Sequence, residues 1–131
     1  IRDFDTAQLK SHEDRLESIL KDVMAEYPQC SYTYVVREQY RNMREVLDHH
    51  PEIIRHAQHA MKACGIDPIS APVRGGTDGS RLSFMGLPCP NLFTGEMALH
   101  SKQEFVSVQD MEKAADVLVN LLQEWERTAI G

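Results

Sequence analysis

One short segment limits how this chain can fold more than any other: the glycine-rich turn RGGTDG at residues 74–79. Glycine at three of its six positions lets the backbone adopt positive φ and approach a ligand closely. Arg74 enters the turn with a planar guanidinium, which suits a carboxylate or a phosphate. The turn lacks the GxxxxGK[ST] pattern of a nucleotide-binding loop. The segment therefore predicts one wall of an anion-recognising site, but not a whole site.

The hydrophobic pattern elsewhere predicts strands mixed with helices. Residues 1–5 alternate between apolar and polar side chains, and residues 30–37 (CSYTYVVR) are rich in β-branched and aromatic types. Two shorter apolar runs, at residues 69–73 and 91–94, are also expected to be strands. The fold class expected from this order is α/β.

Three longer segments carry apolar residues at helical spacing. Asp5 or Thr6 is placed to cap the first of them. Pro51 suits the first turn of the second helix, and Gly65 suits the position just after its end. Ser107 is placed to cap the last helix. A helical turn is expected at residues 82–85.

Composition excludes some function classes. At 131 residues, with 42% hydrophobic and 26% charged residues, the chain suits about one ordinary domain. No apolar run approaches the ~18 residues of a membrane span. A net charge of -6 argues against a nucleic-acid surface. Cys30, Cys64 and Cys89 lack CxxC spacing, which indicates buried, reduced thiols and a cytoplasmic protein.

Histidines offer the clearest candidates for metal binding. His100 is expected in a loop before the last helix, where an imidazole nitrogen could reach a metal. By itself, the sequence favours a solvated loop histidine there, because no neighbour has ligand spacing. His56 and His59 share a helix face, yet no third ligand is evident, so zinc is not expected at that pair.

Several short motifs, in order, carry a resemblance that spans nearly all of the chain. They are IRDFD at residues 1–5, YRNMRE at 40–45, RGGTDG with LSFMGLPCPN and FTG, then HSKQEFV at 100–106, and MEKA in the closing helix. The chain resembles the tripeptide aminopeptidases of the zinc-dependent M20 family. The resemblance implies that residues 1–42 are the second half of a ferredoxin-like β-α-β lid, or dimerisation, domain. It implies that residues 43–131 are the C-terminal part of the zinc-binding α/β catalytic domain.

The resemblance also assigns site residues. His100 corresponds to a zinc ligand of the family, although the preceding EMAL departs from the expected glycine and tyrosine/asparagine. Arg74 is expected to hold the carboxylate end of a peptide. Arg2 and Asn42 belong to the lid, and for each of them a structural role and a contact with substrate are both compatible with the sequence. The complete set of implied substrate-binding residues is Arg2, Asn42, Arg74, Gly75, Gly76 and Thr77.

The function implied is that of a C-terminal fragment of a cytoplasmic tripeptidase, which removes the N-terminal residue of its substrate with a water activated by two zinc ions. The other zinc ligands and the general base are expected upstream, so the chain alone should bind zinc poorly and be inactive. Two alternatives are a non-catalytic module that binds an acidic small molecule and another M20 peptidase or an aminoacylase. The expected partner is a short peptide, with neither nucleic acid nor membrane. Self-association or strand exchange is expected through the open edges at residues 1–5 or 30–37.

Overall fold

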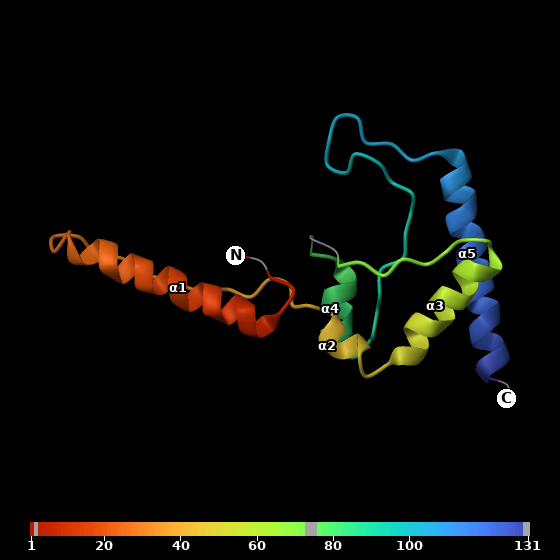
Figure 1. The fold of residues 1–131 in the computed structure, drawn as a ribbon, viewed down its shortest axis with the longest axis horizontal. Coiled ribbons are helices and arrows are strands. Elements are labelled where there is room, and N and C mark those ends of the chain that lie inside the picture. The colour runs from red at the N-terminus through yellow and green to blue at the C-terminus, as the bar shows by residue number, and fades with distance from the viewer. Residues whose placement is uncertain (2, 73–75, 130–131) are drawn as a thin grey trace.

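The structure, a computed structural model, describes residues 1, 3–72 and 76–129. Its helices are α1 (Thr6–Ala25), α2 (Arg44–Leu47), α3 (Pro51–Ala63), α4 (Asp78–Phe84) and α5 (Val108–Ala129). Figure 1 shows α1 projecting as an arm away from the other helices, while α3 and α5 lie side by side at the opposite end. The short helices α2 and α4 lie between these two parts.

The arm begins with the cap that the sequence predicts. The side chain of Asp5 accepts a hydrogen bond of 2.9 Å from the backbone N–H of Gln8, which satisfies one of the free donors at the start of α1. The chain then returns along the helix, and the hydroxyl of Tyr34 donates to the carbonyl of Glu13 at 3.2 Å. No described residue of α1 is buried. The arm therefore contributes little to the core.

The helices α3 and α5 form the main packed unit. Pro51 occupies the first turn of α3, and Gly65 has φ of 72° just beyond its end, as the sequence predicts. Ser107 caps α5, because its hydroxyl accepts a hydrogen bond of 3.0 Å from the N–H of Asp110. The buried apolar residues are few and come mainly from this pair and α2: Leu47, Ala57, Ala60 and Val117.

The expected α/β fold class is not found among the described residues, and neither is the partial ferredoxin-like lid. The only β-pairing there is an isolated antiparallel bridge between Met97 and Phe105. Residues 30–37 and 91–94, both expected as strands, form no strand and have no regular secondary structure. A strand needs a neighbouring backbone to pair its N–H and C=O groups. The described chain provides no such neighbour, so strand-forming composition alone does not produce a sheet.

The cysteines follow the prediction only in part. Cys64 and Cys89 are half-buried free thiols, but Cys30 is exposed, so its expected burial is wrong. Cys30 follows the end of α1, and the residues on either side of it are exposed as well. In the part of the chain that the structure describes, no helix is both long and apolar enough to cross a membrane. The domain boundary expected between residues 42 and 43 stays a prediction.

Candidate functional site

The segment YRNMRE at residues 40–45 ties the start of the arm to the rest of the molecule. Asn42 donates from its side-chain nitrogen to the carbonyl of Phe4 at 2.5 Å and accepts from the N–H of Arg44 at 3.0 Å. The carboxylate of Glu45 accepts a hydrogen bond from the hydroxyl of Thr6. Two motifs that lie about forty positions apart in the sequence are thus joined. Both the nitrogen and the oxygen of the Asn42 side-chain amide therefore make a hydrogen bond within the protein.

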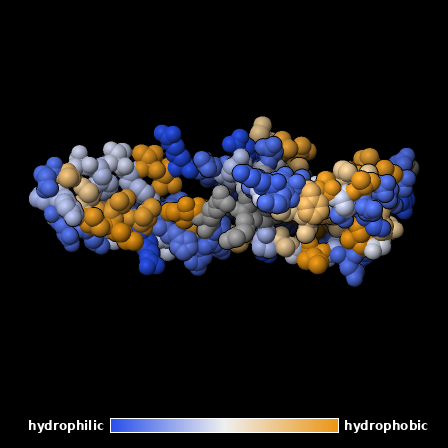
Figure 2. All heavy atoms as spheres, turned by 90° about the horizontal axis from the view of Figure 1, so that it is seen from above, coloured by the Kyte–Doolittle hydropathy of each residue, from blue (hydrophilic) through white to orange (hydrophobic). Residues whose placement is uncertain are grey.

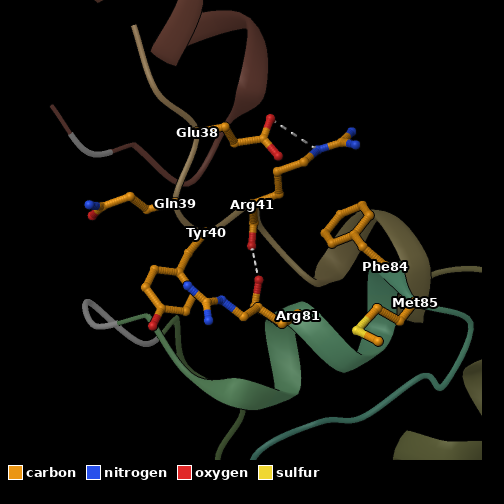
Figure 3. A pocket seen from close by; sticks show the side chains of 8 residues that line it. Glu38, Gln39, Tyr40, Arg41, Arg81, Phe84 and Met85 are labelled. Carbon is orange, nitrogen blue, oxygen red and sulfur yellow. Dashed lines mark hydrogen bonds and ion pairs between the residues drawn. The ribbon is translucent and has the colours of Figure 1, made fainter.

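The same segment also contacts α4. The hydroxyl of Ser80 donates to the carbonyl of Arg41 at 2.5 Å, and the guanidinium carbon of Arg41 lies 4.3 Å from the centre of the Phe84 ring. A hollow of about 260 Å³ lies between residues 38–41 and α4 (Figure 3). In this hollow the guanidinium carbon of Arg81 lies 5.0 Å from the centre of the Tyr40 ring.

The two guanidinium groups of the hollow differ in their electrostatic partners. Arg41 forms an ion pair of 2.5 Å with Glu45 and approaches Glu38 at 4.0 Å. Among the described residues, no carboxylate lies within 4.0 Å of Arg81. Stacking on Tyr40 contributes a modest cation–π attraction and does not use the N–H donors of Arg81, which lines the hollow. This side of the hollow is therefore the more suitable one for an anion.

The glycine-rich turn leads directly into α4. A Cβ atom on Gly76 would overlap the ring of Tyr40, and one on Gly79 would lie 2.6 Å from the carbonyl oxygen of Cys89. Both glycines therefore let the backbone pack closely against other protein atoms. The hydroxyl of Thr77 is buried and makes no hydrogen bond among the described residues.

The structure reaches only part of the predicted substrate-binding set. Arg2, Arg74 and Gly75 lie outside the described residues. Gly76 and Thr77 lie just before the start of α4, and Asn42 lies two residues before the start of α2. The ring of Tyr40 lies against Gly76, and the carbonyl of Arg41 accepts a hydrogen bond from Ser80 of α4. The sequence did not single out Tyr40 or Arg41. Those two side chains belong to YRNMRE, so that motif was the available signal.

His100 is exposed in a loop between Met97 and Phe105. Two backbone hydrogen bonds of 2.9 and 3.2 Å join these two residues and close the loop. In Figure 1 the loop lies at the top of the picture, to the left of the N-terminal end of α5. The expected strand before the loop is absent, as described above, but the loop itself and the exposure of His100 agree with the sequence.

The described residues do not form a metal site by themselves. Among them, no group of three or more His, Cys, Asp or Glu side chains is arranged to hold a metal ion. A catalytic zinc takes three protein ligands and keeps one position open. His100 is an exposed imidazole whose ring makes no hydrogen bond to the described protein, so its chemistry fits that of one zinc ligand. The rest of a zinc site would have to come from other residues.

A second group of histidines serves the packing of α3 against α5. His59 Nδ1 lies 3.2 Å and His56 Nδ1 3.6 Å from the same carboxylate oxygen of Glu124, while Arg127 lies 3.8 Å from the other oxygen. His56 is only 5% exposed, and its ring packs on Trp125 with centres 4.5 Å apart. The hydrogen bond from His59 is the main cause that lowers the pKa of Glu124. The sequence missed Glu124, because it lies 65 positions from His59 and has no spacing signal.

Comparison with known proteins gives the family. Residues 8–124 match the model of peptidase family M20/M25/M40. The chain belongs to this peptidase family. It is 46% identical over 123 residues to peptidase T of Clostridium perfringens strain ATCC 13124. It is 48% identical over 124 residues to peptidase T of Escherichia fergusonii and to that of Escherichia coli strain SE11.

These alignments cover 94% of the chain but only 30% of each relative. The chain therefore spans about a third of the length of these M20 relatives. The membership of the M20 family that the sequence motifs indicated is thus confirmed. The similarity extends over almost all of the described elements, from α1 to α5.

Proposed function

We propose that this chain belongs to a zinc-dependent tripeptidase of the M20 family, which removes the N-terminal residue from short peptides in the cytoplasm. The observation that carries the proposal is the identity of 46–48% to proteins named peptidase T over 94% of the chain. In this proposal, residues 1–42 belong to a lid and residues 43–131 to the catalytic domain. When bound, the two zinc ions would polarise the scissile carbonyl and activate a water.

In this proposal His100 supplies one imidazole to the zinc site. Three features support this role: its exposure, its place in a closed loop, and a ring free of hydrogen bonds to the described residues. The neutral imidazole is a common zinc ligand. The other ligands and the general base belong to parts of the protein other than the described residues.

The proposed substrate contacts come from two places, the glycine-rich turn and the lid. Arg74 would bind the carboxylate end of the peptide through its two-pronged donor, and Gly75, Gly76 and Thr77 would line the cleft. The buried hydroxyl of Thr77, which makes no bond among the described residues, supports a polar partner there. Arg2 and Asn42 would approach from the lid. Asn42 keeps one N–H donor beside its bond to Phe4, and this donor is the one that could contact substrate.

The first test concerns zinc and activity in the complete protein that carries this chain. His100→Ala should lower the bound zinc and reduce kcat/KM for an unblocked tripeptide by more than about 100-fold, since even changes behind a metal ligand cost 10–100-fold. Zinc content by elemental analysis and tripeptide hydrolysis give the two readouts. His49→Ala is the matched control, because His49 is exposed and lies far from the loop in sequence. Its zinc content and activity should equal those of the wild type.

Substrate choice separates this proposal from its alternatives. A tripeptide with a free N-terminus should be cleaved, while the same peptide with an acetylated N-terminus should not. Preferred cleavage of dipeptides or N-acyl amino acids would contradict the tripeptidase assignment within the family. The 131-residue chain alone should cleave none of them. Hydrolysis by this chain would contradict the proposal that the other zinc ligands and the general base come from other parts of the protein.

A further inference from the structure

The loop that carries His100 has an unusual backbone. Among the described residues, the two non-glycine positions with positive φ are Ala98, at 56°, and His100, at 61°. Both lie within the loop between Met97 and Phe105. L-residues seldom adopt this left-handed region, and they stay there only where the surrounding contacts fix it. Something must therefore hold the loop in this conformation.

One side chain is placed to do so. Glu104 Oε2 accepts a hydrogen bond of 2.6 Å from the backbone N–H of His100. A hydrogen bond from an N–H to a carboxylate is stronger than one between neutral groups. Around it, Ser101 N–H donates to the carbonyl of Ala98 at 3.1 Å, and Gln103 N–H donates to the hydroxyl of Ser101 at 3.1 Å.

The geometry of this bond decides what it can control. It is made to the main chain of His100, so both ring nitrogens stay free of it. By holding the N–H of His100, the carboxylate fixes the peptide plane from which the Cα–Cβ bond leaves the loop. The rotation of the ring about its own bonds is left to other contacts.

We propose that Glu104 is a positioning residue for His100: its carboxylate holds the left-handed backbone that presents the imidazole to the metal. This inference rests on the proposed function, in which His100 is a zinc ligand. A metal ligand held in advance in its binding conformation loses less freedom when the metal binds. Glu104 would thus raise metal affinity without touching the metal or the substrate.

The test uses the complete, zinc-loaded protein with the variants Glu104→Gln and Glu104→Ala. Zinc affinity is measured by competition with a chelator, and exchange of the His100 amide hydrogen is measured by NMR or mass spectrometry. Glu104→Ala should weaken zinc binding by about 10-fold, in the range known for partners behind metal ligands, and should speed exchange at His100. Glu104→Gln keeps the shape and a neutral acceptor, so it should show the same changes to a smaller degree.

The matched control is Glu112→Gln on α5, which removes an exposed carboxylate with no ion pair among the described residues. It should change neither readout. Faster exchange at His100 with unchanged zinc affinity in the Glu104 variants would show that the residue only braces the loop and would overturn the inference. Unchanged exchange would overturn it as well. If Glu104→Ala does not fold, the isosteric Glu104→Gln decides alone.

The proposed function can fail separately from this inference. If His100→Ala leaves the zinc content unchanged, His100 is not a ligand, and the proposed function fails at that residue. If His100→Ala loses zinc while both Glu104 variants bind it like the wild type, the metal site stands and only the positioning role is wrong.

Discussion

At the scale of single residues, the left-handed backbone of Ala98 predicts an unusual response to glycine. Ala98→Gly should raise the free energy of unfolding by about 0.5 kcal/mol, because glycine accepts positive φ without the steric conflict of a Cβ atom, although it adds freedom to the unfolded chain. The backbone of Ala98 has φ of 56°, so this conflict exists in the wild type. Urea unfolding followed by circular dichroism measures the change.

The same substitution at an ordinary helical position should have the opposite sign. Ala115 is exposed within α5, so Ala115→Gly should lower the free energy of unfolding by about 1 kcal/mol, the usual cost of glycine in a helix. If Ala98→Gly destabilises the chain as much as this control does, the left-handed conformation of the loop is wrong.

The glycines of RGGTDG show what a residue pattern can and cannot indicate. The sequence predicts that the backbone comes close to something at these positions, and Gly76 and Gly79 do come close to other atoms. The neighbours are the ring of Tyr40 and the carbonyl of Cys89, which are parts of the protein. The absence of a Cβ atom is visible in the sequence, whereas the identity of the neighbour depends on the fold.

At the scale of helices, Glu124 makes the contact between α3 and α5 dependent on pH. The hydrogen bond from His59, with the nearby His56 ring and the charge of Arg127 adding to it, lowers its pKa below the usual 4.5. A carboxyl whose pKa is depressed on folding contributes stability above its unfolded pKa, and this contribution is lost as the pH falls through the folded value. The wild type should therefore be more stable than Glu124→Gln at pH 6, and the two should converge as the pH falls below 4.5 and through the lower pKa of the folded state.

Thermal unfolding at a series of pH values measures this difference. Glu126→Gln is the control, since Glu126 lies on the same helix and makes no ion pair among the described residues. Its unfolding temperature should differ from that of the wild type by the same small amount at every pH. A Glu124→Gln variant that matches the wild type at pH 6 would show that the carboxylate adds nothing to the packing of α3 on α5.

Helix ends could be predicted from the sequence, whereas strands could not. Asp5, Pro51, Gly65 and Ser107 mark helix boundaries in the structure as they do in the sequence, because each acts on backbone groups within a few positions. A strand depends on a distant partner, and residues 30–37 have none among the described residues. For the same reason the sequence located His100 in a loop but could not find its bond to Glu104, which depends on how the loop closes.

At the scale of the whole molecule, the most prominent property is the number of large apolar side chains that are exposed to solvent. Figure 2 shows hydrophobic residues gathered along the arm formed by α1 and the returning chain. Contiguous exposed apolar surface of this kind is typical of interfaces. The exposed large residues of the arm include Leu16, Ile19, Val23, Tyr32, Val35 and Val36.

We expect the 131-residue chain to self-associate through this arm. Residues 30–37 have a strand-forming composition, and their backbone has no partner strand in the described chain, so a second copy can supply one. Val35 is 62% exposed, and Val35→Lys should weaken association by about 10-fold or more, because a charge would then be buried at the interface. Sedimentation equilibrium at several protein concentrations gives the association constant.

A matched substitution outside the arm tests whether the arm itself is responsible. Ile69 is 90% exposed and lies between α3 and α4, so Ile69→Lys adds the same charge to an apolar surface position elsewhere. Association should be unchanged in this variant, since Ile69 is no part of the arm. A wild-type chain that stays monomeric at high concentration would contradict the expectation. Equal weakening by both variants would point to non-specific hydrophobic association, because a defined interface formed by the arm would distinguish position 35 from position 69.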